Sequence, residues 1–472
     1  MVKKERNKLK VENIMFLFRR DLRIRDNIGL IYAAKYEPIL PVFIFDAEQL
    51  SSNHASNNFI QLMCEAVADL DQYLKKQGSR LCCFYGKPCN VVKYLIEKYK
   101  PAVVIYNADY SQYSKTRDAA IRLVCREMDT PVVEAHDVTL LPPERLLAAY
   151  SYRYWEFVKN IGKISVEAKK CHTKFVRKIF AEEWRDYGEF YKPNSQINVS
   201  ATRKAAIARI HHGEDDFVAS RKTLQPGLMI SAHLKLGLIS PREIFDYVVA
   251  HWQRENAVDL VKQLIWRDFY FAFAMKINVG IDVSMPRSIY EFIDHRFHKI
   301  KWLDDPVEIK AMWSGKTGIP LIDAGVRELN KTGFMHNRAR LLVGFFSVKI
   351  LRINPFGKWG GQRYFSRKLI DACYANNTGN WHWVASDMLD SSGQRYSRGF
   401  AGRPSNPQKT LHHDPGCVYV KKWIPEIRGL ENDEIEHWHK IHKKLAHKCD
   451  YIAPIVNVKK RWKEWLKETS PQ

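Results

Sequence analysis

The segment Ile14-Met-Phe-Leu-Phe-Arg-Arg-Asp-Leu-Arg-Ile-Arg-Asp-Asn27 decides the fold of the first part of the chain. Its five opening residues are all apolar and the residues after them are mostly charged, which is typical of a short buried strand. No Gly-x-Gly-x-x-Gly follows the strand, so the usual dinucleotide-binding fingerprint is missing.

Short apolar runs and helix-like stretches alternate from this strand to about residue 140. Strands are predicted at Ile14–Phe18, Ile39–Phe45, Ser79–Tyr85, Ala102–Tyr106 and Pro131–Glu134, and helices at Asn57–Gln77, Val91–Tyr99 and Ser114–Met128. Such alternation predicts a Rossmann-like parallel sheet with helices on both faces. We therefore expect an α/β domain over residues 12–140.

The pattern changes after this domain. Residues 141–200 contain the breakers Pro142-Pro143 and Pro193-Asn194 and predict an inter-domain connector. Over residues 201–465 the strand signals fade, and long amphipathic stretches predict an all-helical domain. These stretches are Val258–Met275, Asp323–Thr332, Asn337–Leu351 and Arg363–Tyr374. The predicted fold class is α/β followed by all-α.

Charge and composition narrow the function. The 472 residues include 75 Lys and Arg against 52 Asp and Glu, a net charge of +23, which favours a polyanion such as nucleic acid over a merely soluble basic protein. The 13 tryptophans fit either a large aromatic core or stacking on bases or a planar cofactor. Nine scattered cysteines without a Cys-x-x-Cys pair predict an intracellular, reducing compartment, cytoplasm or nucleus, and argue against a zinc or iron–sulfur site.

Nothing in the sequence predicts a membrane partner. The apolar run Leu341–Val348 is too short to span a bilayer. The N-terminus is charged and has no apolar core, so we expect no signal peptide.

Three segments combine residues suited to holding a planar ligand. The first is a helical face made of Gln263, Trp266, Arg267 and Tyr270. It offers a flat ring and hydrogen-bonding groups to a pocket, although a core helix whose arginine reaches the rim has the same pattern.

The second segment is Met335–Leu341. On a helix Asn337, Arg340 and Leu341 share a face, whereas Arg338 points about 100° away. One arginine can therefore hold a buried acid while the other reaches a phosphate. The alternative is a solvated basic helix end.

The third segment is Asp371–Trp383. Asn377 and Trp381 are four residues apart and share a face if the segment is helical, whereas Trp381 and Trp383 diverge by about 200°. Large rings aimed in opposite directions are unusual in a core. The pattern favours one ring facing a cofactor and the other facing a substrate.

These segments, in this order, resemble the photolyase/cryptochrome family. Three further motifs carry the resemblance, which runs from about residue 14 to 460: Phe16–Arg23 with Asp26-Asn27, Trp313–Ala324, and Asp414–Glu426. Several long motifs in fixed order are far more specific than a single glycine-rich loop. The resemblance implies an α/β antenna domain and a helical domain that binds FAD.

The resemblance also implies roles for single residues. Arg340 and Asp371 should form a salt bridge beside the flavin, and Asn377 should lie opposite the flavin N5. The implied cofactor-binding residues are Phe217, Ser231, Arg267, Arg340, Asp371, Cys373 and Asn377. The implied electron route for flavin reduction is Trp381, Trp359 and Trp302, with Trp359 beside an apparent insertion. A second, antenna chromophore has no implied identity.

The implied partner is damaged DNA, bound by a monomer. The implied lesion pocket and DNA contacts are Gln263, Trp266, Asn337, Arg338, Leu341 and Trp383, with Arg221 and Arg398. Trp266 and Trp383 would sandwich a flipped-out pyrimidine dimer, which light-driven electron transfer from reduced FAD would split.

Four positions depart from the family pattern. Gln263 stands where most members that repair cyclobutane dimers carry Glu. The (6-4) branch also has Gln at this position, but it needs His at the positions of Asn337 and Leu341. We therefore reject the (6-4) branch. In the phosphate-binding run Gly227–Ser231 only Ser231 keeps a hydroxyl, and Phe217 replaces a Tyr. Ser114 replaces the acid that grips a folate antenna, which leaves the antenna open. Gly399–Ser405 carries extra residues near Arg398, with Arg403 as a second phosphate contact.

Three functions follow as alternatives. The first is a cyclobutane pyrimidine dimer photolyase. The second is a cryptochrome-type blue-light receptor without repair activity, which Gln263 and the reduced phosphate-binding run favour. The third is a basic DNA-binding protein on the same fold without flavin, which the retention of Arg340, Asp371 and Asn377 opposes.

Overall fold

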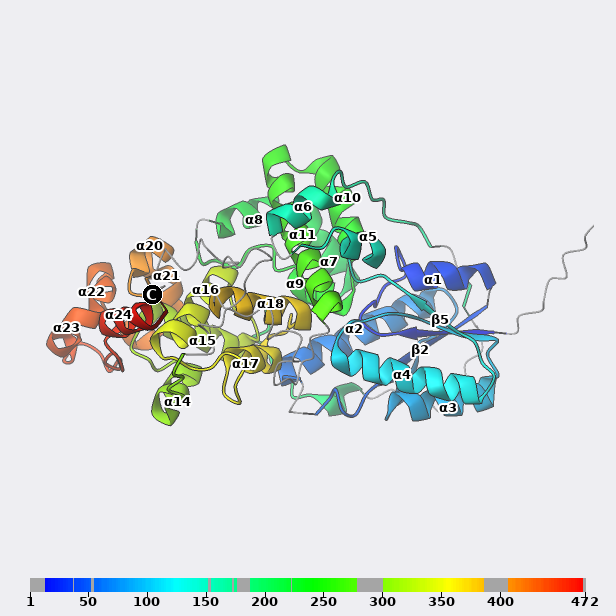
Figure 1. The fold of residues 1–472 in the computed structure, drawn as a ribbon, viewed down its shortest axis with the longest axis horizontal. Coiled ribbons are helices and arrows are strands. Elements are labelled where there is room, and N and C mark those ends of the chain that lie inside the picture. Colours follow the sequence, from blue (N-terminus) through cyan, green and yellow to red (C-terminus); the bar gives the residue numbers. More distant parts are fainter. Residues whose placement is uncertain are drawn as a thin grey trace, which may run out of the picture.

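The computed structural model describes residues 13–36, 38–51, 55–151, 154–171, 174–175, 187–221, 223–277, 300–385 and 406–469. An α/β part and a helical part lie side by side along the long axis of the molecule, and the C-terminal helices are at the far end from the sheet (Figure 1). This arrangement confirms the predicted fold class of an α/β part followed by helices.

The sheet has five parallel strands in the order β3-β2-β1-β4-β5. The strands are β1 Ile14–Phe18, β2 Ile39–Phe45, β3 Cys82–Tyr85, β4 Val103–Asn107 and β5 Val132–Ala135. The first two begin and end as predicted, and the boundaries of the other three move by at most three residues. The helices of this part are α1 Ile28–Ala33, which was not predicted, α2 Asn57–Lys76, α3 Pro88–Tyr99 and α4 Gln112–Glu127.

Strand β1 shows why these strands read as continuous apolar runs. Phe16 belongs to the core that includes residues of α1 and α2, whereas its neighbours Met15 and Leu17 belong to the core formed with α3 and α4. Because helices cover both faces of the sheet, both sets of alternating side chains are buried.

The strand order also locates a crevice. The chain passes from β1 to β2 and β3 on one side, then crosses to β4 and β5 on the other side. In such sheets the loops diverge at the carboxyl ends of the strands where the order reverses, and ligands bind in the space between them.

The remaining helices form the larger part of the molecule. They are α5 Pro143–Ala148, α6 Tyr154–Ile161, α7 Arg203–His212, α8 Glu214–Ser220, α9 Ser231–Leu236, α10 Pro241–His251, α11 Arg254–Ile277, α14 Pro306–Ser314, α15 Pro320–Thr332, α16 Asn337–Phe345, α17 Gly361–Lys368, α18 Tyr374–Ala385, α20 Thr410–His413, α21 Val418–Trp423, α22 Asn432–Glu436, α23 Trp438–Leu445 and α24 Val458–Thr469. The predicted connector thus contains α5 and α6, which pack against α11. None of the described helices is long and apolar enough to cross a bilayer.

One predicted helix is wrong in its extent. The stretch Arg363–Tyr374 is divided between α17 and α18, because Leu369 is extended and the backbone N–H of Ile370 donates to the carbonyl of Gly333, 2.9 Å away. A tertiary hydrogen bond therefore ends the helix that the amphipathic pattern continued, and Asp371 lies in the resulting turn.

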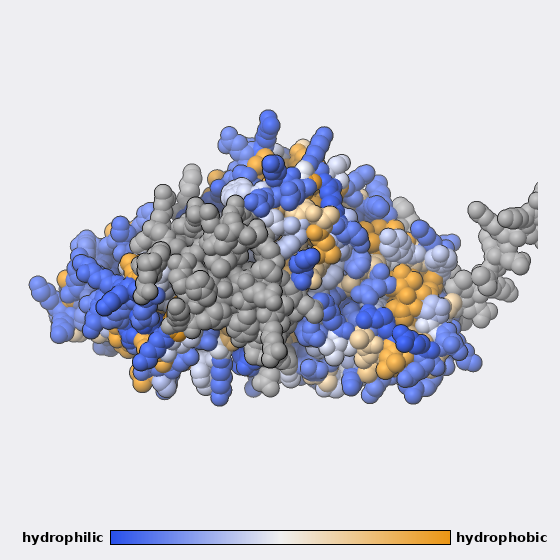
Figure 2. All heavy atoms as spheres, in the orientation of Figure 1, coloured by the Kyte–Doolittle hydropathy of each residue, from blue (hydrophilic) through white to orange (hydrophobic). Residues whose placement is uncertain are grey.

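The helices share two cores. One core runs from the sheet through α6, α7 and α9–α11, and the other joins α14–α18 with the C-terminal helices. The seam between them lies where α9 and α11 meet α16 and α18. Hydrophilic side chains cover much of the end formed by α22–α24 (Figure 2).

Candidate functional site

Asp371, in the turn before α18, accepts hydrogen bonds from side chains of two other helices. Ser231, the first residue of α9, donates its hydroxyl to Asp371 Oδ2 at 2.6 Å, and Arg340 Nη2 of α16 donates to the same oxygen at 2.8 Å. Arg340 is held in place by a hydrogen bond from its Nε to the Met335 carbonyl, 2.8 Å long. The structure thus forms the predicted Arg340–Asp371 ion pair.

Within the described part of the chain, two of the predicted cofactor-binding residues, Asp371 and Arg267, each have a buried polar atom without a hydrogen-bond partner. Asp371 Oδ1 accepts no hydrogen bond, and Arg267 Nη1 lies 3.6 Å from Asp268 Oδ1, too far to donate. Burial lowers the pKa of Arg267, which packs over the Phe271 ring at 4.7 Å. Buried polar atoms without partners are costly, so this unpaired donor and acceptor fit a ligand that carries both kinds of polar group, as FAD does.

The structure also describes two other predicted cofactor positions, Cys373 and Phe217, and Gly227 of the predicted phosphate-binding run. The thiol of Cys373 is buried close to the guanidinium of Arg20 and to Lys235. Phe217 is buried on α8, where its ring packs against Trp252 with 5.7 Å between centroids. Gly227 passes so close to α8 that a side chain there would meet Ser220, which explains a glycine at the start of the phosphate-binding run.

Asn377 and Trp381 are one turn apart on α18, as predicted. The Asn377 amide donates to the Gln362 carbonyl and to the Ser366 hydroxyl, both at 2.8 Å, and its Oδ1 accepts from Trp381 Nε1 at 3.1 Å. Both amide hydrogens are therefore used, and the remaining capacity of Asn377 is one acceptor lone pair.

The three tryptophans of the predicted electron route have different surroundings. Trp381 is 3% exposed and packs edge-to-face on Phe365, whereas Trp359 is 54% exposed. The Trp359 carbonyl accepts a hydrogen bond from Trp313 Nε1 at 2.9 Å. Trp302 is half-buried, 6.4 Å from the Trp465 ring centroid.

Trp266 of α11 and Trp383 of α18 meet at the seam, but they do not form the predicted sandwich. Their ring centroids are 5.4 Å apart and their planes differ by 84°. Rings at a right angle cannot both stack on one base, so the pair forms a corner. The reason is the close approach of the two helices, at which the Tyr270 ring lies against Gly379.

Tyr154 is a neighbour that sequence reasoning missed. Its ring stacks on Trp266 with 3.5 Å between centroids and 4° between planes, and its hydroxyl donates to the Lys262 carbonyl at 3.3 Å. No local pattern indicates a contact over such a separation along the chain. The stacked tyrosine covers one face of Trp266.

The remaining predicted DNA contacts lie at the surface of the same region. Gln263 of α11 and Asn337, which begins α16, are exposed, whereas Arg338 and Leu341 are partly buried. Arg221 is exposed and forms an ion pair with Asp259. Arg398 and Arg403 lie outside the described residues.

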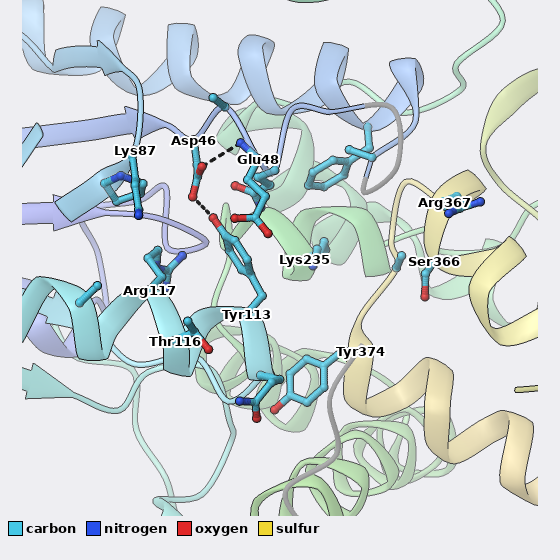
Figure 3. Close-up of a pocket in the computed structure, with 18 of the residues that line it drawn as sticks. Asp46, Glu48, Lys87, Tyr113, Thr116, Arg117, Lys235, Ser366, Arg367 and Tyr374 are labelled. Carbon is cyan, nitrogen blue, oxygen red and sulfur yellow. Dashed lines mark hydrogen bonds between the residues drawn. The ribbon is translucent and has the colours of Figure 1, made fainter. Parts of the chain in front are cut away.

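Apart from the polar cluster around Asp371, a cavity of about 670 Å³ lies at the carboxyl ends of the strands, between the sheet and the helical part (Figure 3). It is called the second cavity below. Its walls come from the loop after β2, from α2–α4, from α9 and from α17. It adjoins a smaller cavity of about 120 Å³, which includes Ser114 and the residues that follow β1. Ser114 is buried, and its hydroxyl accepts from Ser111 at 2.8 Å.

Basic side chains dominate this second cavity. Lys87, Arg117, Lys235, Arg363 and Arg367 line it, against the acids Asp46 and Glu48. The Asp46 carboxylate is already engaged by the Tyr113 hydroxyl and the Glu48 N–H. Burial, followed by repulsion from Arg20, lowers the pKa of Lys235 to about 8, so it is charged at neutral pH. The cavity therefore suits an anionic ligand.

The described residues contain no cluster of His, Cys, Asp and Glu suited to a metal ion.

Comparison with known proteins places the chain in a family. Residues 14–165 match the model for DNA photolyase, and residues 260–470 match the model for the FAD binding domain of DNA photolyase. Together the two ranges take in most of the chain. The protein therefore belongs to the photolyase/cryptochrome family, as the sequence motifs predicted, and it contains the FAD-binding domain of that family.

Individual relatives match nearly the whole chain. A deoxyribodipyrimidine photo-lyase of Halobacterium salinarum is 29% identical, over 95% of this chain and 96% of the relative. Cryptochrome-1 of Aedes aegypti is 26% identical, over 95% and 90%. The crystal structure of an archaeal photolyase from Sulfolobus tokodaii with two FAD molecules has a TM-score of 0.82 at 29% identity, over 97% of this chain and 99% of that one.

Relatives named photo-lyase and cryptochrome thus occur at similar identity. The choice between the two functions rests on the site residues.

Proposed function

We propose that the protein is a light-dependent photolyase that repairs cyclobutane pyrimidine dimers in DNA. The observation that carries the proposal is that α18 joins two kinds of group. Asn377 and Trp381 are buried on the helix that follows Asp371, while Trp383 meets Trp266 in a partly exposed corner. One helix therefore connects a buried polar ligand site with an aromatic surface.

FAD would be held by Asp371, Arg340, Ser231 and Arg267, because Asp371 Oδ1 and Arg267 Nη1 need polar partners and Ser231 and Arg340 hold Asp371 in place. The chemistry that reduced FAD supplies when bound is light-driven transfer of one electron. The free lone pair of Asn377 Oδ1 suits an N–H donor, and a neutral amide places no negative charge near an anionic ring. Trp381, buried beside Asn377, is the first residue of the route by which we expect electrons to enter.

The corner of Trp266 and Trp383 would receive the flipped-out dimer. Tyr154 covers one face of Trp266, so the dimer would rest against the other ring surfaces rather than between two parallel rings. Base–aromatic stacking of this kind contributes about 1–3 kcal/mol per base. Gln263, Asn337 and Arg338 offer hydrogen-bond donors around the corner, and the net charge of +23 favours the phosphate backbone.

We also propose that the second cavity binds an anionic, planar antenna chromophore. Its basic lining, its volume of about 670 Å³ and the rings of Phe59 and Tyr113 support this assignment. The archaeal relative solved with two FAD molecules, described as implying a novel light-harvesting cofactor, makes a second flavin the first candidate to test.

The decisive experiment measures repair under blue light. FAD-loaded, pre-reduced protein is illuminated with oligonucleotides that carry either a cyclobutane dimer or a (6-4) product, and restored thymines are quantified. We expect repair of the cyclobutane dimer alone. In Trp266→Ala we expect weaker lesion binding with flavin still bound, and in Trp381→Phe slower photoreduction with repair retained by pre-reduced protein.

Flavin binding without repair of either lesion would support the cryptochrome alternative, which Gln263 in place of Glu and the reduced phosphate-binding run favour. Repair of the (6-4) product would overturn the rejection of that branch, which rests on Asn337 and Leu341 standing where two His are needed.

A further inference from the structure

Trp155 is an exposed tryptophan that the proposed site does not yet use. It is the second residue of α6 and is 73% exposed, more than any other tryptophan among the described residues. Tryptophan is usually well buried, and an exposed indole on an ordered helix is typical of an interaction surface.

The helix that carries Trp155 is firmly anchored. Tyr154, Phe157 and Ile161 are 4%, 0% and 5% exposed and belong to the core that also contains α11. Trp155 packs edge-to-face on Tyr154, with 5.1 Å between centroids and 67° between planes. Trp155 is therefore an exposed indole on a helix that the core holds in place.

The same contacts place Trp155 beside the lesion corner. Tyr154 touches Trp155 on one side and stacks on Trp266 at 3.5 Å on the other. The Tyr154 hydroxyl also binds the Lys262 carbonyl, directly before Gln263. Trp155 is thus separated from Trp266 by the single ring of Tyr154.

A positive charge lies next to the exposed ring of Trp155. Lys159 follows Trp155 by one helical turn, is exposed, and forms no ion pair within the described part of the chain. An exposed indole with a lysine one turn away provides a stacking surface for a base together with a cation for its phosphate.

We infer that Trp155 and Lys159 form a second base-binding site, at which an unpaired base next to the lesion stacks on Trp155 while Lys159 contacts its phosphate. The inference rests on the proposed repair function and extends it to the flanking DNA. A stacked base must leave its helix, so this site favours single-stranded or locally unpaired DNA over intact duplex.

Fluorescence of 2-aminopurine tests the site directly. The oligonucleotides carry a dimer and a 2-aminopurine one or two nucleotides away from it. They are either single-stranded or duplexes in which the 2-aminopurine is left unpaired, and they are titrated with FAD-loaded protein. We expect the wild type to quench 2-aminopurine, Trp155→Phe to retain most of the quenching, and Trp155→Ala to lose it with an affinity loss of about 5- to 150-fold. Lys159→Gln should reduce the slope of log affinity against log salt by about 0.7–0.9.

A matched control is Tyr73→Ala, which removes a 48% exposed aromatic residue from α2. It should leave affinity and quenching unchanged. Unchanged quenching and affinity in Trp155→Ala would overturn the inference, as would an equal loss for intact undamaged duplex. Quenching and affinity are measured without light, so an absence of repair in the wild type would count against the proposed function and not against this site.

Discussion

At the residue scale, one buried acid links the fold to the site. Glu328 of α15 is 3% exposed and accepts a hydrogen bond of 2.6 Å from the Tyr419 hydroxyl. Burial raises the pKa of Glu328 to about 7, although Tyr419 and the backbone N–H of His336 favour its ionised form. His336 in turn caps α16, because its Nδ1 accepts from the Arg338 N–H at 3.2 Å. Glu328 therefore orients the start of the helix that carries Asn337.

The raised pKa predicts a pH dependence of stability. Between the ordinary pKa of a glutamate and about 7, the folded protein binds more protons than the unfolded chain, so this group's contribution falls as pH rises through that window. Glu328→Gln keeps an acceptor for Tyr419 and removes the titration. Relative to wild type it should be more stable by about 3 kcal/mol at pH 8 and nearly equal at about pH 4, measured by thermal unfolding.

Glu426→Gln is the control for Glu328→Gln, because the pKa of Glu426 is shifted in the opposite direction. The ion pair of Glu426 with Arg327, 2.8 Å long, outweighs burial and lowers the pKa of Glu426. Its contribution is present at neutral pH and lost in acid, so this variant should be the less stable one at pH 7. A pH-independent difference between Glu328→Gln and wild type would contradict the assignment.

At the element scale, a glycine sets the distance between α11 and α18. A side chain at Gly379 would lie 2.1 Å from the Tyr270 ring, and one turn later on α18 and one turn earlier on α11 Trp383 meets Trp266. In the opposite direction the next turn carries Ala375 and Ala274, both 1% exposed. Small residues thus allow the close approach that forms the aromatic corner.

Gly379→Ala should push the two helices apart. We expect a loss of about 1–3 kcal/mol in the free energy of unfolding from overpacking, together with weaker binding of dimer-containing DNA. Denaturant unfolding and DNA titrations measure the two effects.

Gly325→Ala is the matched control, because a side chain there meets Ala339 and Val343 at an ordinary 3.4 Å. This change inside α15 should stabilise by up to about 1 kcal/mol through helix propensity. The packing argument fails if Gly379→Ala behaves like Gly325→Ala.

At the scale of the whole molecule, a buried ion network joins the sheet to the helices. Arg242 of α10 donates from Nε to Asp26 Oδ2 and from Nη2 to Asp137 Oδ1, each at 2.7 Å. Arg23, which follows β1, donates to the other Asp137 oxygen at 2.6 Å. All four side chains are almost completely buried. The network holds the α/β part against α10.

Arg242→Leu should destabilise the protein severely. It leaves Asp26 and Asp137 with less compensating charge inside the protein, and removing one partner of a buried ion pair costs about 3–5 kcal/mol. Arg122→Leu removes the exposed ion pair with Glu134 and should cost at most about 1 kcal/mol. Thermal unfolding of both variants compares them, and similar losses would mean that the buried network does not join the two parts.

Local patterns predicted much of this architecture because they act over a few residues. The strands β1 and β2 were predicted to the residue, since an apolar run between polar residues is already a complete signal for a strand buried on both faces. The helix over residues 363–374 was not predicted correctly, because the hydrogen bond of Ile370 to Gly333 depends on the folded chain.

The sequence by itself determined the fold class, the family and which residues are candidates for the site, since period, composition and ordered motifs are local properties of the chain. Only the tertiary structure decided how those residues meet: Trp266 and Trp383 at a right angle, Tyr154 stacked on Trp266, Trp359 at the surface, and a basic cavity at the carboxyl ends of the strands. The physical reason is that ring orientation, burial and cavity shape arise from the packing of segments distant in the chain, and no short stretch of sequence encodes them.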